Sequence, residues 1–280
     1  MRILITGSNG QLGREIVNQL NNSDHDIIAT TSKSFDIRDR ELIIQTFKKY
    51  NPEVVINCAS YTAVDDCEVE ENYKIAYQIN VEAVKYLAIE CEKYKSKFIH
   101  FSTDYVFDGL GNKPLKETHK RNPINKYGQT KMLSEDAIIK YCSRYFILRT
   151  SWLYGDGNNF VKTMLKLVES NSELNVVGDQ IGSPTYTKDL TWVILKLMET
   201  DLYGVYHGTN QGECSWYEFA KEIFRIKGVE VKVNKVTSEE YVRQAKRPKY
   251  STLDNNNLRE VGLDLFRPWK EALEDYLRIN

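Results

Sequence analysis

The sequence predicts an α/β fold built on a doubly wound parallel sheet, followed by a smaller mixed α/β domain. Short apolar runs alternate with amphipathic stretches through the first half of the chain, as strands and helices do in a parallel sheet. A glycine-rich turn at residues 7–13 stands between the first apolar run and the first amphipathic stretch. This placement is typical of the Rossmann architecture, in which the turn binds a dinucleotide.

The first expected elements are a buried strand at residues 2–6 and a helix at residues 12–20. The strand is a short apolar run, and the helix carries its leucines, isoleucine and valine at helical spacing. A second strand and helix follow at residues 26–30 and 41–50. The second helix stops before Pro52, because proline disfavours helical geometry in the residue before it.

The same alternation continues to the end of the first half. A third strand is expected at residues 54–58, and one long helix at 71–94, where apolar residues trace a single face. A fourth strand is expected at 97–102, a helix opens at Tyr127, and a fifth strand is expected at 145–149. These units complete the predicted parallel sheet.

The pattern changes after about Thr150. Loops such as residues 155–159 become longer, and short strands such as 204–209 separate the helices. We therefore predict a dinucleotide-binding domain over residues 1–150 and a substrate-binding domain over residues 151–280, with some segments of the second packing back on the first.

Composition excludes several classes of function. The net charge is −1 and there is no long run of Lys and Arg, which argues against nucleic acid or an anionic membrane as the main partner. The five cysteines form no CxxC pair and no metal-site spacing with the four histidines, so we expect reduced thiols, a cytoplasmic protein and no metal. The N-terminal apolar run is too short for a signal peptide, and no stretch reaches the length of a membrane span.

The glycine turn predicts a nucleotide site. Gly7, Gly10 and Gly13 permit a tight turn and a close approach of the backbone to a pyrophosphate, and the following helix offers free N–H groups. The spacing is GxxGxxG, one residue wider than the common fingerprint. The second strand ends in Thr30-Thr31-Ser32-Lys33 without the acid that binds the ribose of NAD, which favours NADPH while leaving NADH possible.

Three side chains form a candidate catalytic set. Tyr127 and Lys131 are four residues apart and therefore share one helix face, where the lysine charge would lower the pKa of the phenol. Such a pair is also common on solvated helix faces. Thr103 ends the fourth strand, at the sheet edge where α/β folds hold ligands, and its hydroxyl is placed to meet the carbonyl that Tyr127 would protonate. A strand-end Ser-Thr pair also often only caps or turns the chain.

These features together resemble the extended short-chain dehydrogenases/reductases, and within them the dTDP-4-dehydrorhamnose reductase family. The similarity runs almost from end to end of the chain. The motifs that carry it are GSNGQLG (7–13), YTAVD (61–65), STDYVF (102–107), YGQTK (127–131), RTSWLYG (149–155), GNNFVKTM (157–164), DQIGSPT (179–185) and KRP (246–248).

The resemblance implies an activity and a set of roles. NAD(P)H would deliver hydride to C4 of dTDP-4-dehydro-L-rhamnose and give dTDP-L-rhamnose, a donor for cell-surface polysaccharide. Tyr127 would donate the proton, Lys131 would assist it and bind the nicotinamide ribose, and Thr103 would polarise the carbonyl. The implied cofactor-binding residues are Gly7, Gly10, Gln11, Leu12, Gly13, Asp36, Ile37, Ser60, Tyr61, Thr62, Phe101 and Lys131, with Asp36 and Ile37 near the adenine. The implied substrate-binding residues are Thr62, Asp104, Tyr105, Tyr127, Trp152, Asn159 and Arg247, and of these Asn159 and Arg247 could reach the diphosphate.

Several alternatives stay open from the residues. Trp152 could be a core aromatic and Arg247 could belong to a surface ion pair. Some relatives dimerise through magnesium held by glutamates, but a single glutamate at a helix start, Glu15, more often complements the helix dipole, so we predict no metal and a monomer or homodimer.

Two other functions compete with the reductase. A sugar-nucleotide dehydratase or epimerase shares the fold, but dehydratases place an Asp-Glu pair after the threonine, whereas here Asp104 is followed by Tyr105. A non-catalytic NADP-binding regulatory subunit would have little need of the complete set of Thr103, Tyr127 and Lys131.

Overall fold

Six parallel strands form the central sheet, in the order β10-β5-β4-β3-β1-β2. The structure is a computed structural model that describes residues 1–21 and 23–279. The chain builds outward from β1 on both sides, so the sheet is doubly wound, as predicted, and its switch point lies between β1 and β3. The strands are β1 (Arg2–Thr6), β2 (Asp26–Ala29), β3 (Val54–Asn57), β4 (Lys97–Thr103), β5 (Tyr145–Thr150) and β10 (Gly204–His207).

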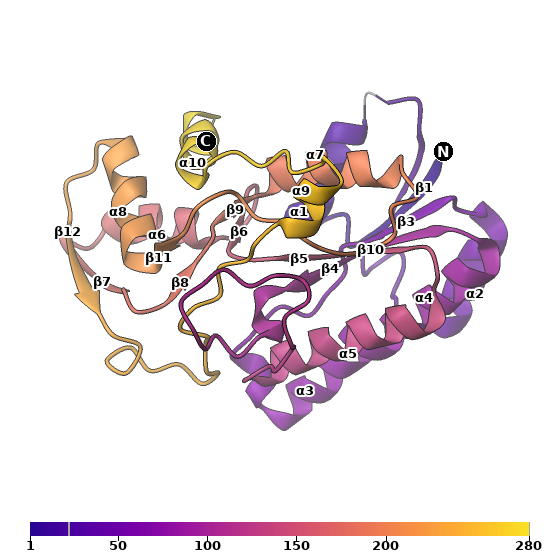
Figure 1. Cartoon of the computed structure of the whole chain (residues 1–280), viewed down its shortest axis with the longest axis horizontal. Coiled ribbons are helices and arrows are strands. Elements are labelled where there is room, and N and C mark those ends of the chain that lie inside the picture. The colour runs from indigo at the N-terminus through magenta and orange to yellow at the C-terminus, as the bar shows by residue number, and fades with distance from the viewer. Residues whose placement is uncertain (22, 280) are drawn as a thin grey trace.

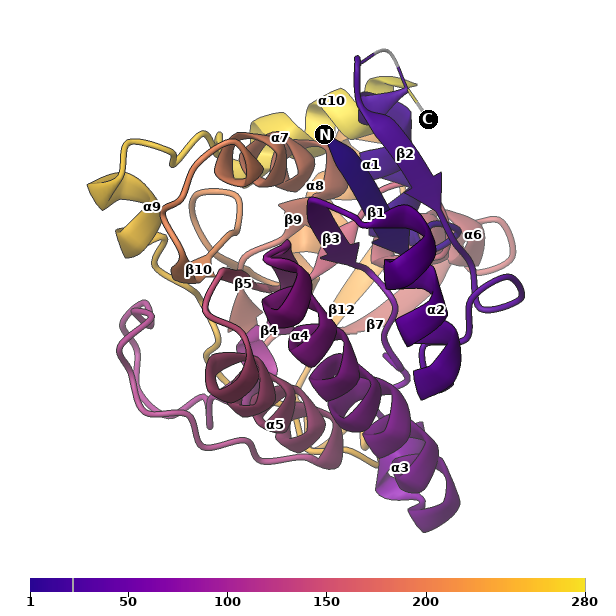
Figure 2. The same cartoon turned by 90° about the vertical axis from the view of Figure 1, so that its right-hand side faces the viewer.

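Helices cover both faces of this sheet (Figures 1 and 2). Alternate residues of β1 explain why, since Ile3 and Ile5 join one apolar cluster and Leu4 joins another on the opposite face. The first face is covered by α1 (Gln11–Leu20), α7 (Thr187–Met198) and α9 (Asn256–Glu260). The second is covered by α2 (Arg40–Tyr50), α4 (Ala83–Tyr94) and α5 (Lys126–Tyr141).

Local capping sets where these helices begin and end. The Asp39 side chain accepts a hydrogen bond from Leu42 N at the start of α2, and Asn51 closes that helix in the left-handed conformation, directly before Pro52. At the start of α5, the Asn125 side chain accepts from Gly128 N at 2.7 Å. This cap fixes the first turn of α5, which contains Tyr127.

The single helix predicted at residues 71–94 is wrong in one respect. The segment consists of α3 (Glu70–Tyr77), a π-helical turn η2 (Gln78–Glu82) and α4. A π turn adds a residue to the helical repeat and so rotates the face that follows. Here it turns Asn80, which is only 1% exposed, toward the loop after β3.

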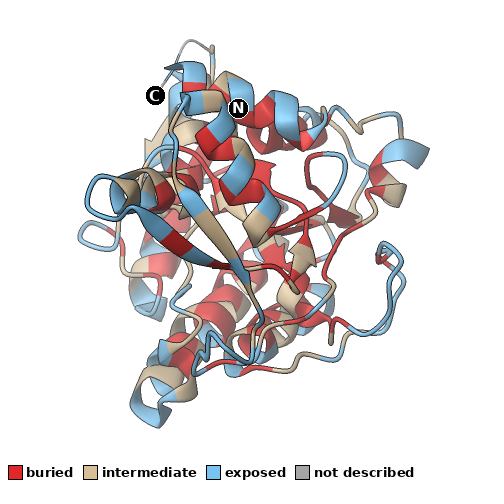
Figure 3. Cartoon of the chain, turned by 90° about the vertical axis from the view of Figure 1, so that its left-hand side faces the viewer, coloured by how far each residue is buried: buried red, intermediate tan, exposed pale blue. Residues whose placement is uncertain are grey.

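The second half of the chain forms a smaller lobe with its own aromatic core (Figure 1). Figure 3 shows that buried residues gather on the strands and inner helix faces of both lobes. The remaining elements are η1 (Asp66–Glu68), η3 (Asp104–Val106), β6 (Leu153–Tyr154), α6 (Phe160–Val168), β7 (Glu173–Val177), β8 (Ile181–Gly182), β9 (Thr185–Tyr186), β11 (Cys214–Ser215), α8 (Trp216–Lys227), β12 (Lys232–Val236) and α10 (Trp269–Ile279).

Some segments after residue 151 lie in the larger lobe. Strand β10 extends the central sheet by pairing with β5, from Gly204 beside Phe146 to His207 beside Arg149. Helices α7 and α9 pack on the same sheet face as α1. Across the described residues, every helix is too short or too polar to span a membrane.

Candidate active site

The glycine turn lies at the carboxyl end of β1, at the switch point of the sheet. Gly7 has a φ of +63°, and a Cβ there would lie 2.7 Å from Ala59 N, so only glycine fits. A Cβ on Gly13 would lie 2.3 Å from Gly7 O. Helix α1 begins directly after Gly10, and among the described residues the buried Gln11 Nε2 has no hydrogen-bond partner. Free donors at a helix N-terminus beside a closely packed turn fit a pyrophosphate.

We expect Gly13→Ala to weaken binding of the predicted coenzyme NADPH by about 10- to 100-fold, because the added methyl group forces α1 away from Gly7 O at a typical overpacking cost. Fluorescence titration of the purified variant measures this change. Gly178→Ala is the matched control, since its Cβ would meet only the flexible Lys235 side chain. Unchanged affinity in a folded Gly13→Ala protein would contradict the assignment of the turn.

The residues predicted near the adenosine follow β2. Ser8 N donates to Thr30 O, which places the turn beside the end of β2. The Asp36 carboxylate pairs with Arg38 at 2.6 Å, and hydrogen bonding from Arg38 lowers the pKa of that carboxyl. Ile37 is 5% exposed and belongs to the core cluster beneath α2 and α4. Their proposed contacts with the adenine stay predictions.

The loop after β3 carries Ser60, Tyr61 and Thr62, and Asn80 of η2 holds it in place. Asn80 Oδ1 accepts from Ser60 Oγ at 3.0 Å and from Tyr61 N at 2.8 Å. Its Nδ2 donates to Tyr61 O and to Thr130 Oγ1. The side chain therefore ties the predicted cofactor loop to α5. Thr62 lies exposed in this loop.

The three predicted catalytic residues meet where β4 ends and α5 begins. Thr103 closes β4, and its hydroxyl is near enough to the Tyr127 phenol to lower the pKa of that phenol, in opposition to burial. Thr103 Oγ1 also donates to Asp104 Oδ1 at 2.9 Å. The rings of Tyr105 and Tyr127 pack edge to face, with centroids 6.1 Å apart. Phe101, two residues before Thr103, packs partly buried against the cluster beneath α1 and α7.

The expected lowering of the Tyr127 pKa is wrong for the protein alone. Burial raises the pKa of the phenol, and the charge of Asp104 raises it further. The reason is geometric, since the Lys131 ammonium contacts His100 rather than the phenol. Tyr127 therefore carries its proton at neutral pH, as a proton donor must.

Lys131 is almost fully buried, at 2% exposure, and its Nζ lies 3.2 Å from His100 Nε2. Burial lowers the pKa of Lys131 to about 8, although the charge of Glu135 opposes this change. His100 is equally buried, and burial together with the Lys131 charge lowers the pKa of its imidazole well below the usual value. At neutral pH the pair thus holds its proton on the lysine.

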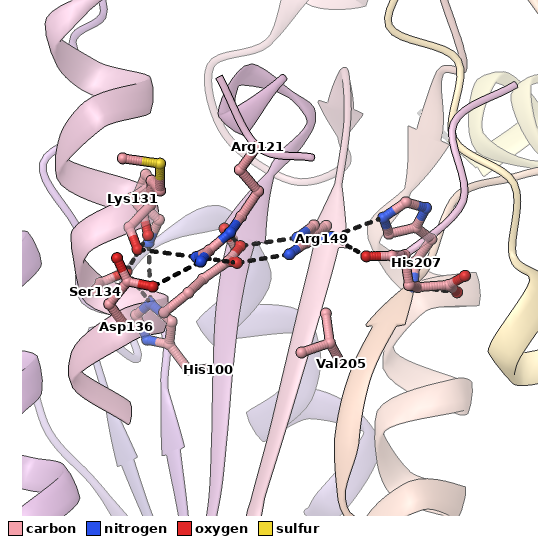
Figure 4. A network of polar contacts seen from close by, with 12 residues as sticks. His100, Arg121, Lys131, Ser134, Asp136, Arg149, Val205 and His207 are labelled. Atoms are coloured by element: carbon pink, nitrogen blue, oxygen red, sulfur yellow. Dashed lines mark hydrogen bonds and ion pairs between the residues drawn. The ribbon is translucent and has the colours of Figure 1, made fainter. Parts of the chain in front are cut away.

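One helical turn beyond Lys131, Glu135 is buried in an ionic network (Figure 4). Arg149 of β5 donates to both of its oxygens, at 2.9 and 2.7 Å. Arg121 donates to Oε2 at 3.0 Å, and Ser102 Oγ donates to Oε1 at 2.5 Å. Tyr127, Lys131 and Glu135 share one face of α5. The network therefore fixes the rotation of α5 against β4 and β5.

Asp104 and Tyr105 line the same end of the sheet. Asp104 is 2% exposed, and burial raises the pKa of its carboxyl to about 6, with hydrogen bonds from Ser251 and Thr103 opposing the change. Burial also raises the pKa of the Tyr105 phenol. An acid of this kind changes its charge near neutral pH, close to the Tyr127 hydroxyl.

Trp152 stands at the start of the second lobe with a φ of +46°, an uncommon conformation for a bulky residue. Its ring stacks on Trp216 with centroids 3.5 Å apart and the planes inclined by 8°. Gly182 leaves room for the ring, because a Cβ there would come within 2.7 Å of it. The structure thus holds Trp152 in one orientation by packing from both sides.

The two residues predicted to bind the diphosphate already have partners within the protein. Asn159 caps α6, where its Oδ1 accepts from Lys162 N and its Nδ2 donates to Gly155 O. Arg247 pairs with Asp65 at 2.8 and 3.0 Å. The alternative ion pair for Arg247 is therefore present, and it bridges the two lobes. Binding of diphosphate by either side chain stays a prediction.

Sequence reasoning missed three of the residues that organise the site, namely Asn80, His100 and Glu135. A polar residue within an otherwise apolar run was the available signal for His100, whereas Asn80 lies between Gln78 and Glu82 and has no such signal. Glu135 extends the spacing of four from Tyr127 and Lys131 by one more turn. Its burial depends on Arg149, which the sequence places 14 residues away on another element.

Comparison with known proteins gives consistent matches along the whole chain. The family model described as RmlD substrate binding domain matches residues 1–280. The spore coat polysaccharide biosynthesis protein SpsK of Bacillus subtilis (strain 168) is 44% identical, over 99% of this chain and 97% of that protein.

Solved structures agree with this match. A dTDP-4-dehydrorhamnose reductase from Clostridium acetobutylicum ATCC 824 is 48% identical with a TM-score of 0.98, covering 100% of this chain and 99% of that one. The dTDP-4-dehydrorhamnose reductase from Bacillus anthracis str. Ames, solved in complex with NADP, is 42% identical with a TM-score of 0.97 and the same coverage.

Proposed function

Because the chain belongs to the RmlD substrate binding domain family, we propose that it is an NADPH-dependent dTDP-4-dehydrorhamnose reductase. It reduces C4 of dTDP-4-dehydro-L-rhamnose and gives dTDP-L-rhamnose. The observation that carries this function is the placement of Thr103 at the end of β4, with Tyr127 and Lys131 on one face of α5, at the sheet edge that also holds the glycine turn. Relatives of known structure are reductases of this name, and one of them binds NADP.

We further propose a division of labour between the lobes. Residues 1–150 bind the dinucleotide, and residues 151–280 bind the sugar nucleotide, while β10, α7 and α9 return to the first lobe. The stacked Trp152 supports this assignment, because a rigid aromatic wall suits a sugar ring. The five free cysteines suit a reducing compartment, and we propose that the protein acts in the cytoplasm as a monomer or homodimer.

Each of the three predicted catalytic residues has its own role in the proposed reduction. NADPH, when bound, supplies the hydride that adds to C4 of the sugar. Tyr127 donates its hydroxyl proton to the oxygen on C4, and its raised pKa keeps that proton in place until the basic alkoxide forms. Thr103 donates a hydrogen bond to the same oxygen. Lys131, whose ammonium contacts His100 in the cofactor-free protein, lies one turn beyond Tyr127 on the same helix face and would bind the nicotinamide ribose.

The residues at this site do not support the two competing functions. Water elimination needs a second acid beside Asp104, and the neighbouring residue is Tyr105, whose ring packs against Tyr127. A regulatory subunit has no use for a buried lysine and tyrosine aligned with a strand-end threonine.

The function is tested by following NADPH absorbance with purified protein and dTDP-4-dehydro-L-rhamnose generated in situ. We expect NADPH oxidation that depends on the sugar nucleotide. An equal rate without the sugar would contradict the substrate assignment. NADPH left unchanged while the sugar is converted would favour a dehydratase or epimerase.

A further inference from the structure

Lys131 has an unusual environment for a buried cation. Its Nζ lies within hydrogen-bonding distance of a neutral ring, His100 Nε2, at 3.2 Å. Among the described residues no carboxylate lies within ion-pair distance of it, since Glu135 is taken by Arg149 and Arg121. A buried charge without a hydrogen bond is strongly disfavoured. His100 is therefore the contact that allows an ammonium to persist at this position.

The surroundings of His100 restrict which of its nitrogens can accept. Its Nδ1 lies 3.0 Å from Asn57 Nδ2, and its Nε2 lies 3.2 Å from Ser134 Oγ. Asn57 Oδ1 in turn accepts from Thr6 Oγ1 at 2.5 Å. A neutral imidazole carries one proton, so one nitrogen donates and the other accepts. The identity of the acceptor then depends on the orientation of the Asn57 amide.

Two hydrogen-bond patterns are possible along this chain of contacts, and the first is the arrangement of the structure, in which Asn57 Nδ2 faces the ring. They differ at Ser134 Oγ, which donates its own proton to Lys131 O at 2.7 Å and can therefore accept from Nε2–H but makes no hydrogen bond to an Nε2 that lacks a proton. With Asn57 Nδ2 directed at the ring, Nδ1 accepts and the Nε2 proton points toward Ser134 and Lys131, which suits a neutral lysine amine. After a half-turn of the amide, Nδ1–H donates to Asn57 Oδ1, and Nε2 accepts from a Lys131 ammonium. Thr6 Oγ1 serves either orientation, because a hydroxyl both donates and accepts.

We propose that His100 is a positioning residue for Lys131, which it holds as an ammonium through its Nε2. Loss of the lysine proton is accompanied by a change of His100 tautomer and a half-turn of the Asn57 amide. The consequence for turnover rests on the proposed function, whereas the hydrogen bond is a property of the cofactor-free protein.

Other charges near α5 do not replace this contact. Among the described residues, Glu135 is the one whose charge acts on the pKa of Lys131. It faces the lysine from the same helix and is present in every variant considered below. The titratable and charged groups around this end of α5 come from α5, the segment before it, β4, β5, η1 and η3. They are Tyr127, Glu135, Arg121, His100, Arg149, Cys67, Asp104 and Tyr105.

The test is an NMR titration of the cofactor-free full chain with labelled lysine, in which Lys131→Met identifies the Lys131 signal. Removing the acceptor disfavours the charged form, so His100→Leu should lower the Lys131 pKa by roughly one to two pH units. His100→Gln keeps an acceptor and should stay closer to wild type. If the leucine variant does not fold, His100→Met provides the same apolar replacement.

A second buried histidine provides the matched control. His207 is 0% exposed and lies 3.3 Å from Arg149 Nη1, without a contact to Lys131. His207→Leu should leave the Lys131 titration unchanged. An equal shift in this variant, or no shift in folded His100→Leu, would overturn the proposal.

Nitrogen-15 shifts of His100 report its tautomer directly. We expect the Nδ1–H form while Lys131 is charged and the Nε2–H form once it is neutral. A His100 tautomer that never changes would overturn the proposed tautomer change.

In kinetics, His100→Leu should move the loss of kcat/KM at high pH to a lower pH, whereas a purely structural defect lowers activity equally at every pH. If the wild-type protein shows no turnover, the proposed function fails, but the two titrations still decide the role of His100.

Discussion

Tyr127→Phe lowers kcat by roughly 10²- to 10⁴-fold, the usual contribution of a positioned general acid. The substitution removes only the hydroxyl that lies beside Thr103, while the ring keeps its edge-to-face packing on Tyr105. NADPH affinity should therefore change little. Steady-state kinetics and a fluorescence titration of the coenzyme measure the two quantities on the same preparation.

Tyr141→Phe provides the control for this change. Tyr141 lies at the end of the same helix, partly buried against the α2 and α4 side of the core and far along the helix from Thr103. It should retain wild-type kcat. Full activity in Tyr127→Phe would remove the proton-donor role, and equal losses in both variants would point to damage of α5 instead.

The second large effect concerns stability. Arg149→Met removes the bidentate partner of the Glu135 carboxylate, which is 0% exposed, and leaves Arg121 as its remaining ion-pair partner among the described residues. Breaking one side of a buried ion pair typically costs about 3–5 kcal/mol, because the remaining charge stays desolvated. We expect a loss of this size in urea unfolding. Since Glu135 shares a face of α5 with Tyr127 and Lys131, kcat should fall as well.

A double variant separates the buried charge from the lost packing. Arg149→Met with Glu135→Leu removes both charges and should recover a large part of the stability. Arg225→Met is the exposed control, because Arg225 pairs with Glu222 on the surface of α8 and should leave the unfolding midpoint near that of wild type. A double variant as unstable as the single one would show that the loss of the bidentate partner of the Glu135 carboxylate is not the cause.

Local sequence signals predicted the parts of the site that neighbouring residues create. The glycine turn depends on contacts among Gly7, Gly10 and Gly13 and the strand beside them, so its pattern is visible in one stretch of chain. The Tyr127–Lys131 spacing predicted a shared helix face for the same reason. The predicted parallel sheet is confirmed, since strand and helix periodicity are also local.

The missed features depend on residues distant in sequence. The helical spacing of apolar residues cannot reveal a π turn. The turn at η2 is stabilised by the hydrogen bond between Asn80 and the loop at Tyr61, which is 19 residues away in the sequence. The pKa of Tyr127 was misjudged because spacing shows which side chains share a face but not that His100 captures the Lys131 ammonium. The Trp152–Trp216 stack likewise joins residues that are 64 positions apart in the sequence, and the Trp152 ring also lies against Gly182.

In the proposed reaction, a hydride passes from the coenzyme to C4 of the sugar while a side chain of this protein protonates the oxygen. The most direct test is a reaction with NADPH that carries deuterium in place of the transferable C4 hydrogen, followed by NMR and mass spectrometry of the sugar nucleotide. We predict dTDP-L-rhamnose with a single deuterium at C4 of the sugar. Product without deuterium at that carbon, or deuterium that stays in the coenzyme while the sugar is consumed, would contradict the account.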